Sequence, residues 1–162
     1  DFLLAEQLAS LYLVGGMLLV TALFLGLTYG RGQTGYSVEQ FSATGALAVG
    51  GAQGLAVLPG MSRSGATIAA GLLLGLNREE AATFSFLLSI PAIIGAQLLS
   101  WKDLSGGAVS LDAAVWLGSL TAFGVGYLAL KVLLKLVHQG RFYLFAPYCL
   151  IVGLLVLGIT GG

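Results

Sequence analysis

The sequence predicts an all-α membrane protein, a bundle of transmembrane helices that includes one re-entrant helix-loop-helix hairpin. Of the 162 residues, 57% are hydrophobic and 9% are charged, and the mean hydropathy is +0.96. Several long stretches carry no charge, and two shorter apolar stretches are joined by a loop rich in proline, glycine and serine. A soluble domain has about 25% charged residues. The composition therefore excludes a water-soluble domain, and it excludes disorder, which requires a chain poor in apolar residues.

Net charge and cysteine content exclude further classes of protein. The chain has 7 basic and 7 acidic residues and a formal net charge of zero. We therefore expect no basic face for nucleic acid. Cys149 is the single cysteine of the sequence, which excludes a disulfide framework and a cysteine-based zinc site.

Four stretches are long enough to cross a bilayer, which takes about 20 apolar residues. We expect spans at about 8–28, 80–99, 111–137 and 142–159. With the hairpin, they form a single transmembrane domain over residues 1–162. The chain starts with Asp1 close to the first span, with neither Met nor a signal peptide, so we expect a fragment of a longer polypeptide.

The region of about 41–76 is predicted to form the hairpin. Its first apolar stretch ends at Pro59-Gly60, and its second, from Thr67 to Leu76, covers about 15 Å as a helix. One kinked continuous span is the alternative. The distribution of Lys and Arg residues favours the hairpin, because cytoplasmic loops carry an excess of these residues. If it enters and leaves on the cytoplasmic side, Lys102 lies outside and the other loop cations lie inside, namely Arg31, Arg78, Lys131, Lys135 and Arg141.

Small residues recur at a spacing of four in three stretches, and such stripes let helix backbones approach closely in lipid. The stripes are Ala46/Gly50/Gly54, Gly71/Gly75 and Gly118/Ala122/Gly126. We expect them to serve packing.

The loop of the hairpin carries the one constellation with a chemical meaning. Arg63 has apolar segments on both sides, and a cation in the membrane centre costs roughly 2.5–3.5 kcal/mol, so an anionic partner is expected. Ser62, Ser64 and Thr67 offer hydroxyl donors, while Gly60 and Gly65 permit close approach of the backbone. A helix that begins near Ala66–Thr67 would direct its N-terminus at the same place. The pattern predicts a phosphate cradle. The alternative is that Ser64 or Thr67 only caps this helix and Arg63 pairs with a glutamate or reaches the interface.

The same residues carry a resemblance to a known family. The run Gly54-Leu55-Ala56-Val57-Leu58-Pro59-Gly60-Met61-Ser62-Arg63-Ser64-Gly65-Ala66-Thr67-Ile68 resembles the signature of the undecaprenyl-pyrophosphate phosphatases, the bacitracin-resistance family. The runs Gly75–Ala82 and Phe84–Pro91 are also similar to that family. The resemblance extends from Leu8 to the C-terminus and identifies the chain as the second half of such a protein.

This resemblance implies a bacterial inner-membrane hydrolase, open toward the periplasm. Its members convert undecaprenyl pyrophosphate to undecaprenyl phosphate, the carrier lipid of peptidoglycan synthesis, and inorganic phosphate. The implied fold is an inverted repeat of two re-entrant hairpins. The resemblance assigns catalytic roles to Ser62, Arg63 and Thr67 and a lesser role to Gln53. We expect Ser64, Gly60, Gly65 and Gln53 to bind substrate. Ser85 either lines the same cavity or only bonds within or between helices.

The chain departs from the family pattern by lacking the first repeat, with its paired glutamates and its Ser/His segment. We therefore expect no metal site in this chain, and a divalent ion (Mg or Ca) held by the missing N-terminal half. The expected partners are that half, the polyprenyl pyrophosphate lipid and the bilayer, and a homodimer stays open. His138, the single histidine, is expected at the inner interface without a catalytic role. The rival function is a transporter or channel for a phosphate-bearing or other anionic substrate, and a purely structural subunit is the third.

Overall fold

A computed structural model describes residues 2–104 and 113–161, with side chains described over 11–100 and 113–160. Its elements are α1 (Phe2–Gly26), η1 (Val38–Gln40), α2 (Ala43–Leu55), α3 (Arg63–Leu73), α4 (Arg78–Leu104), α5 (Ala113–His138), η2 (Phe142–Leu144) and α6 (Phe145–Gly161). Within the described ranges the backbone forms helices and no β-strand. The predicted class, an all-α membrane bundle, is confirmed.

Three described helical segments have the length and composition to cross a membrane: Arg78–Ser100, Ala113–His138 and Phe142–Thr160. The expected spans at 80–99, 111–137 and 142–159 correspond to them, although residues 111 and 112 lie outside the described residues. The apolar part of α1 whose side chains are described, Leu11–Gly26, is shorter. The chain is a multi-pass membrane protein.

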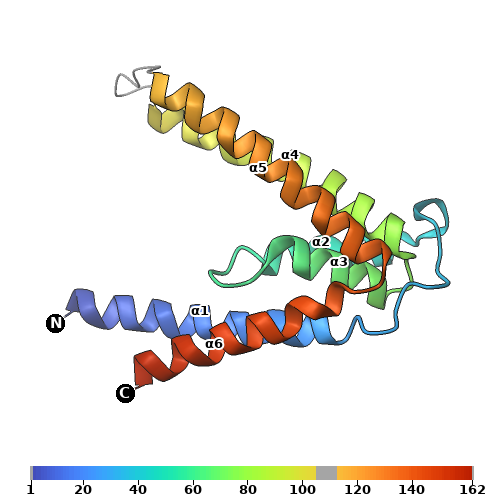
Figure 1. Ribbon diagram of the computed structural model, residues 1–162, viewed down its shortest axis with the longest axis horizontal. Coiled ribbons are helices and arrows are strands. Elements are labelled where there is room, and N and C mark those ends of the chain that lie inside the picture. Colours follow the sequence, from blue (N-terminus) through green and yellow to red (C-terminus); the bar gives the residue numbers. More distant parts are fainter. Residues whose placement is uncertain (1, 105–112, 162) are drawn as a thin grey trace.

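The helices form a V with two arms, and the hairpin of α2 and α3 lies between them (Figure 1). One arm pairs α1 with α6. There the Tyr12 hydroxyl donates to the carbonyl oxygen of Thr160 at 2.7 Å. A Cβ added to Gly15 would lie 2.7 Å from Leu157 Cγ, so glycine is what allows these two helices to meet so closely.

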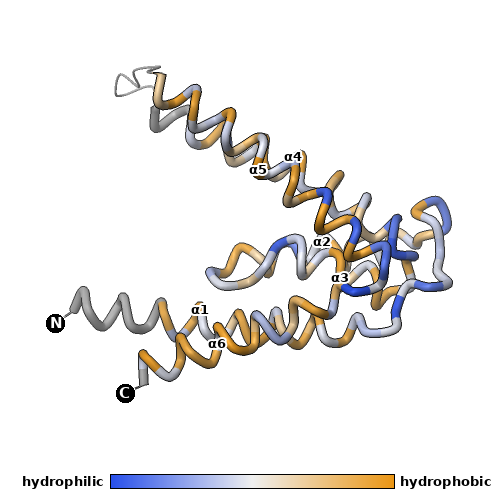
Figure 2. Tube along the Cα trace, viewed as in Figure 1, coloured by the Kyte–Doolittle hydropathy of each residue, from blue (hydrophilic) through white to orange (hydrophobic). Residues whose placement is uncertain are grey.

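The other arm pairs α4 with α5, and the outer half of this arm is not covered by any other described helix. Nearly all of α5 from Ala113 to Val132 is exposed, and its surface is mostly apolar (Figure 2). Gly118 and Gly126 of the third small-residue stripe have nothing within 4 Å of an added Cβ, whereas Gly71 packs against Ala81, at 3.3 Å from an added Cβ. Within the described chain, Gly71 on α3 therefore serves packing as expected, whereas Gly50 and Gly54 on α2 and the glycines of the stripe on α5 meet no neighbour.

The hairpin begins and ends at the closed end of the V, which we define as the linker 27–42, the turn 74–77 and the turn 139–144. The backbone N–H of Tyr36 donates to Gly75 O at 2.8 Å, and that of Asn77 donates to Tyr36 O at 3.1 Å. These bonds bring the segments that enter and leave the hairpin side by side. The chain thus returns to the end from which it came, as the hairpin interpretation predicts.

The core of the protein lies near the closed end, where α1, α3, α4 and η2 meet. Its buried apolar side chains are Ala22, Leu25, Ile68, Leu72, Leu76, Ala81, Ala82, Val137, Phe142 and Cys149. Between helices in a bilayer, such side chains contribute mainly through close van der Waals packing. This core fixes α3 against both arms, and α3 in turn carries the residues of interest at its other end.

Candidate functional site

The apex of the hairpin, residues 56–62, is held against α1 by a close backbone contact. Gly60 has φ +91°, a conformation that residues with a side chain rarely adopt. A Cβ at this position would collide with the backbone carbonyl of Val14. Gly60 therefore lets the apex turn tightly and pack directly on α1.

A hydrogen bond from α1 fixes the start of α3. The backbone N–H of Ser62 donates to Thr21 Oγ1 at 3.2 Å, and Thr21 is 2% exposed. The sequence reasoning missed Thr21. The available signal was a hydroxyl residue inside the otherwise apolar stretch 8–28.

Ser62 is the N-cap of α3, with its Oγ accepting from the backbone N–H of Gly65 at 3.1 Å. A Cβ on Gly65 would lie 2.9 Å from Ser62 Oγ, so glycine permits this close cap. The expectation that the helix begins near Ala66–Thr67 was wrong, since α3 begins at Arg63. Because a capping serine is one of the strongest helix-start signals, the first turn forms as soon as Ser62 is in place.

The first turn of α3 leaves donors free. Helix geometry gives the backbone N–H groups of Arg63 and Ser64 no intrahelical acceptor, and no other described residue accepts from them. These amides carry the partial positive charge of the helix N-terminus. The apex is therefore a set of oriented donors beside a cationic side chain.

Arg63 is exposed within the chain, and no described acidic side chain pairs with it. It lines a cavity of about 500 Å³ together with Gln53 and with residues of α2, its C-terminal turn and α4, namely Gly50, Gly54, Ala56, Val57 and Ala92. The expected burial of the guanidinium among apolar helices is thus not found within this chain. The alternative in which it pairs with a glutamate is not found among the described residues either.

Gln53 shares this cavity and has one unsatisfied atom. Its Nε2 donates to the carbonyl oxygen of Leu88 on α4 at 3.2 Å. Its Oε1 is buried and has no partner in the described chain. A buried acceptor without a donor is costly. Arg63 therefore offers free guanidinium donors to the cavity, whereas the unsatisfied Oε1 of Gln53 is closed off from it.

Ser62 and Ser64 face a second cavity, of about 330 Å³, on the other side of the apex. Apart from these two residues and Gly65, its walls are apolar or aromatic and come from α1, α5, η2 and α6: Leu18, Leu25, Leu133, Phe142, Phe145, Tyr148 and Cys149. Polar groups thus lie at one wall of an otherwise apolar space.

Thr67 and Ser85 are brought together, but away from both cavities. Their hydroxyl oxygens lie 2.6 Å apart, and the two residues are 1% and 3% exposed. Thr67 Oγ1 also lies 2.9 Å from the carbonyl oxygen of Arg63, to which it donates. The pair ties α3 to α4 inside the protein. Among the residues singled out from the sequence, Arg63 and Gln53 share one cavity, and Ser62, Ser64 and Gly65 share the other.

The described residues do not fit the divalent metal that the resemblance implies. Among the described residues, no three His, Cys, Asp or Glu side chains cluster closely enough to hold an ion. No carboxylate lines the cavity of Arg63, and its guanidinium would repel a cation. His138 lies at the closed end, where it lines a different cavity. No chemical step is therefore assigned to a metal held by these residues.

Comparison with known proteins places these features in a family. The family model for bacitracin resistance protein BacA matches residues 1–155. A protein of Desulfosudis oleivorans named undecaprenyl-diphosphatase is 64% identical over 93% of this chain and 55% of its own length. Proteins with the same name from Desulforapulum autotrophicum and Methanothermobacter thermautotrophicus are 56% and 46% identical, over 91% and 92% of this chain and 53% and 84% of their own lengths.

The chain thus spans about half the length of the first two relatives, at 55% and 53%. The matched region contains the apex with Ser62 and Arg63 and every element described above except the end of α6. A match over residues 1–155, nearly the whole sequence, shows that the chain belongs to the bacitracin resistance protein BacA family.

Proposed function

We propose that this chain supplies the phosphate-binding part of a membrane hydrolase that converts undecaprenyl pyrophosphate to undecaprenyl phosphate and inorganic phosphate. The observation that carries the proposal is the apex, where the unpaired guanidinium of Arg63 lies at the N-terminus of α3 beside two free amides. Membership of the family and the names of its relatives support the same activity.

In this reaction the bond from the terminal phosphorus to the bridging oxygen breaks, undecaprenyl phosphate leaves, and water supplies the new oxygen of inorganic phosphate, either by direct attack or by hydrolysis of a phosphoserine formed first. Arg63 would hold the phosphate oxygens through its planar fork. Together with the amides of Arg63 and Ser64, it would stabilise the negative charge that builds up during transfer. Gln53 Oε1 is buried in this structure, so it would accept a hydrogen bond from water or from a protonated phosphate oxygen only once its side chain turns toward Arg63. The described residues near Arg63 include no general base, so we assign activation of the nucleophile to the remainder of the protein.

Among the hydroxyl and glycine residues, only the two serines, Ser62 and Ser64, contact the substrate in this proposal. The hydroxyl hydrogen of Ser62 is free to donate while its oxygen caps α3, and Ser64 donates from the same turn. Gly60 and Gly65 shape the backbone. Thr67 and Ser85 act indirectly, because their mutual bond holds α3 in place against α4.

The apolar cavity beside Ser62 and Ser64 is proposed to accept the first part of the prenyl chain. Its aromatic and aliphatic walls suit an isoprenoid. Its polar wall adjoins the apex, where the pyrophosphate would lie. A lipid that enters sideways between α5 and α6 would therefore keep its tail in apolar surroundings while its headgroup reaches Arg63.

The proposed location is the bacterial cytoplasmic membrane, with the closed end of the V inside and the apex open toward the periplasm. Arg31, Arg78 and Arg141 lie at the closed end, and Lys131 and Lys135 lie on the part of α5 that leads to it. This distribution agrees with the positive-inside rule.

The proposed partner is an N-terminal half of the same enzyme, as the resemblance implies. It would supply the carboxylates for an Mg or Ca ion. It would also cover the exposed face of α5, which carries a stripe of small residues. A homodimer through the same face is the alternative arrangement.

The test is Arg63→Lys and Arg63→Ala in the complete protein that contains this chain. Phosphate release from a polyprenyl pyrophosphate is measured in detergent, and Arg141→Lys, a change of an exposed residue at the closed end, is the matched control. We expect at least a tenfold loss of kcat/KM for Arg63→Lys, since one lost charged hydrogen bond is worth about 1.5–3 kcal/mol. Near-normal hydrolysis by both variants would refute the role of Arg63. A protein that releases no phosphate but moves anions across liposomes in an Arg63-dependent way would be a transporter.

A further inference from the structure

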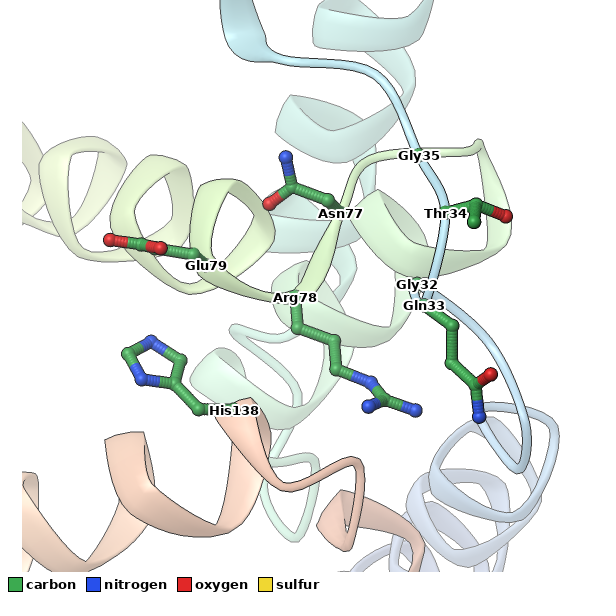
Figure 3. Close-up of a pocket in the computed structure, with 8 residues that line it drawn as sticks. All are labelled: Gly32, Gln33, Thr34, Gly35, Asn77, Arg78, Glu79 and His138. Carbon is green, nitrogen blue, oxygen red and sulfur yellow. The ribbon is translucent and has the colours of Figure 1, made fainter.

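A third cavity, unrelated to the apex, opens at the closed end of the V. Its volume is about 550 Å³, and its lining is predominantly polar: Gly32, Gln33, Thr34, Gly35, Asn77, Arg78, Glu79 and His138 (Figure 3). It lies at the opposite end of α3 from Arg63. No step of the proposed hydrolysis uses it.

Backbone hydrogen bonds and a close backbone contact hold the walls of this cavity in place. The backbone N–H of Arg78 donates to Gly32 O at 3.3 Å, next to the two bonds between Tyr36 and the turn before α4. A Cβ on Gly35 would lie 2.6 Å from the Asn77 backbone nitrogen, so the linker is in direct contact with that turn. The linker 32–35, the start of α4 and the end of α5 are thus held around one space.

Arg78 presents an unused anion-binding group to this space. Its Nε donates to Arg31 O at 3.2 Å, and its guanidinium packs on the backbone of Gly140. These contacts fix the plane of the group. The described chain gives its two terminal nitrogens no acceptor and pairs it with no acid. A fixed guanidinium fork with free N–H groups matches the oxygens of a phosphate.

Neutral donors and one acid complete the lining. In Figure 3 the side chain of Gln33 extends on the same side as the Arg78 guanidinium, while the Glu79 carboxylate points the opposite way along α4, above His138. The amide of Gln33 can donate to an oxygen held by Arg78. The Glu79 carboxylate repels a highly charged anion. It can accept a hydrogen bond from a hydroxyl or amine on the part of a ligand that lies away from Arg78.

We propose that this cavity binds the phosphodiester headgroup of a membrane lipid such as phosphatidylglycerol, with Arg78 and Gln33 on the phosphate and Glu79 on the hydroxyl groups. The closed end carries further cations, Arg31 and Arg141, and basic pockets at the ends of transmembrane helices are where anionic headgroups bind. Free phosphate shares the phosphate chemistry but lacks the hydroxyl-bearing part and carries more charge.

The test uses the complete protein that contains this chain, purified in a nonionic detergent. The affinity for a short-chain phosphatidylglycerol is measured by calorimetric titration, and inorganic phosphate is titrated as the soluble probe. We expect Arg78→Gln to weaken lipid binding by about tenfold or more, as loss of a charged hydrogen bond predicts. Gln33→Leu changes an exposed linker side chain and should weaken binding less. Arg141→Gln, which removes a charge at the same end outside the cavity, should leave it within about twofold.

Each outcome bears on the proposal. Lipid binding that is weakened by Arg78→Gln and by Gln33→Leu but not by Arg141→Gln supports it, and circular dichroism checks that the variants stay helical. Binding that falls equally with Arg141→Gln overturns it, because the attraction would then be a general one to the basic end. If inorganic phosphate binds as tightly as the lipid, the proposal that the ligand is a lipid headgroup is overturned. Unchanged binding in both Arg78→Gln and Gln33→Leu overturns the site. If Arg78→Gln misfolds, unchanged binding in Gln33→Leu overturns it.

Discussion

Thr21 on α1 accepts a hydrogen bond from the backbone N–H of Ser62 across 3.2 Å, and so joins α1 to the residue that caps α3. Thr21 is buried, while Ser62 is exposed at the apex. The bond therefore reaches from the packed interior to the edge of the cavities. It sets the position of the first turn of α3, and with it the position of Arg63, relative to the α1/α6 arm.

Replacing Thr21 by valine should misplace this turn. Valine keeps the shape of threonine but cannot accept the hydrogen bond, which is worth about 1 kcal/mol. We expect a modest fall in thermal stability and a larger proportional fall in kcat for phosphate release. Thr21→Ser keeps the hydroxyl and should restore kcat even if it loses some packing. If Thr21→Val and Thr21→Ser lose kcat equally, the side chain matters only for packing.

Gly60→Ala should damage the apex more severely. The alanine would need φ near +91° and would place its Cβ against the carbonyl of Val14. Strain of this kind costs about 1–3 kcal/mol, before the clash is counted. We expect a lower melting temperature and lost phosphate release in the complete protein. Gly51→Ala on α2 is the control, because an added Cβ there has nothing within 4 Å and alanine favours helix. Destabilisation by Gly51→Ala of the same size would contradict this explanation.

Much of the fold could be predicted because it follows from local features of the sequence. Long uncharged stretches predict the helices, and the Pro59-Gly60 break with two short flanking stretches predicts the hairpin. The exact start of α3 could not be predicted. Ser62, Ser64 and Thr67 are all capable caps, and the choice among them is fixed by Thr21, which lies 41 positions earlier in the chain.

The candidate site was predictable only in part for the same reason. The motif places Ser62 and Arg63 together because they are neighbours in sequence. It does not reveal that Thr67 turns toward Ser85, because that pairing depends on the packing of α3 against α4. The cavity around Arg78 is formed by three segments that are separated along the chain, so no single stretch of sequence indicates it.

The pair of Thr67 and Ser85 predicts a non-additive stability effect. Thr67→Val alone leaves the buried Ser85 hydroxyl without its partner, and Ser85→Ala does the same to Thr67, except that Thr67 keeps its bond to Arg63 O. Each single change should cost about 1–3 kcal/mol. The double variant should cost less than the sum, by an interaction energy of at least 0.5 kcal/mol, as expected for residues in contact. Unfolding free energies of the four proteins measure this term, and strict additivity would argue against the bond.

Gln53→Met should separate stability from activity. Methionine has a similar shape but lacks the buried Oε1 that has no partner, so its introduction removes an unsatisfied acceptor while it also loses the bond from Nε2 to Leu88 O. These effects oppose each other, and we expect the melting temperature to change little. If Oε1 accepts from water or phosphate in the reaction, kcat/KM should fall about tenfold, which equals 1.4 kcal/mol of lost stabilisation.

Gln53→Glu should instead weaken the binding of the substrate before the reaction begins. A carboxylate in the cavity would pair with Arg63 and compete with the pyrophosphate, and this should raise KM more than it lowers kcat. Full activity of Gln53→Met would mean that the oxygen plays no part in the chemistry, and an unchanged KM in Gln53→Glu would mean that Arg63 does not meet the substrate in this cavity.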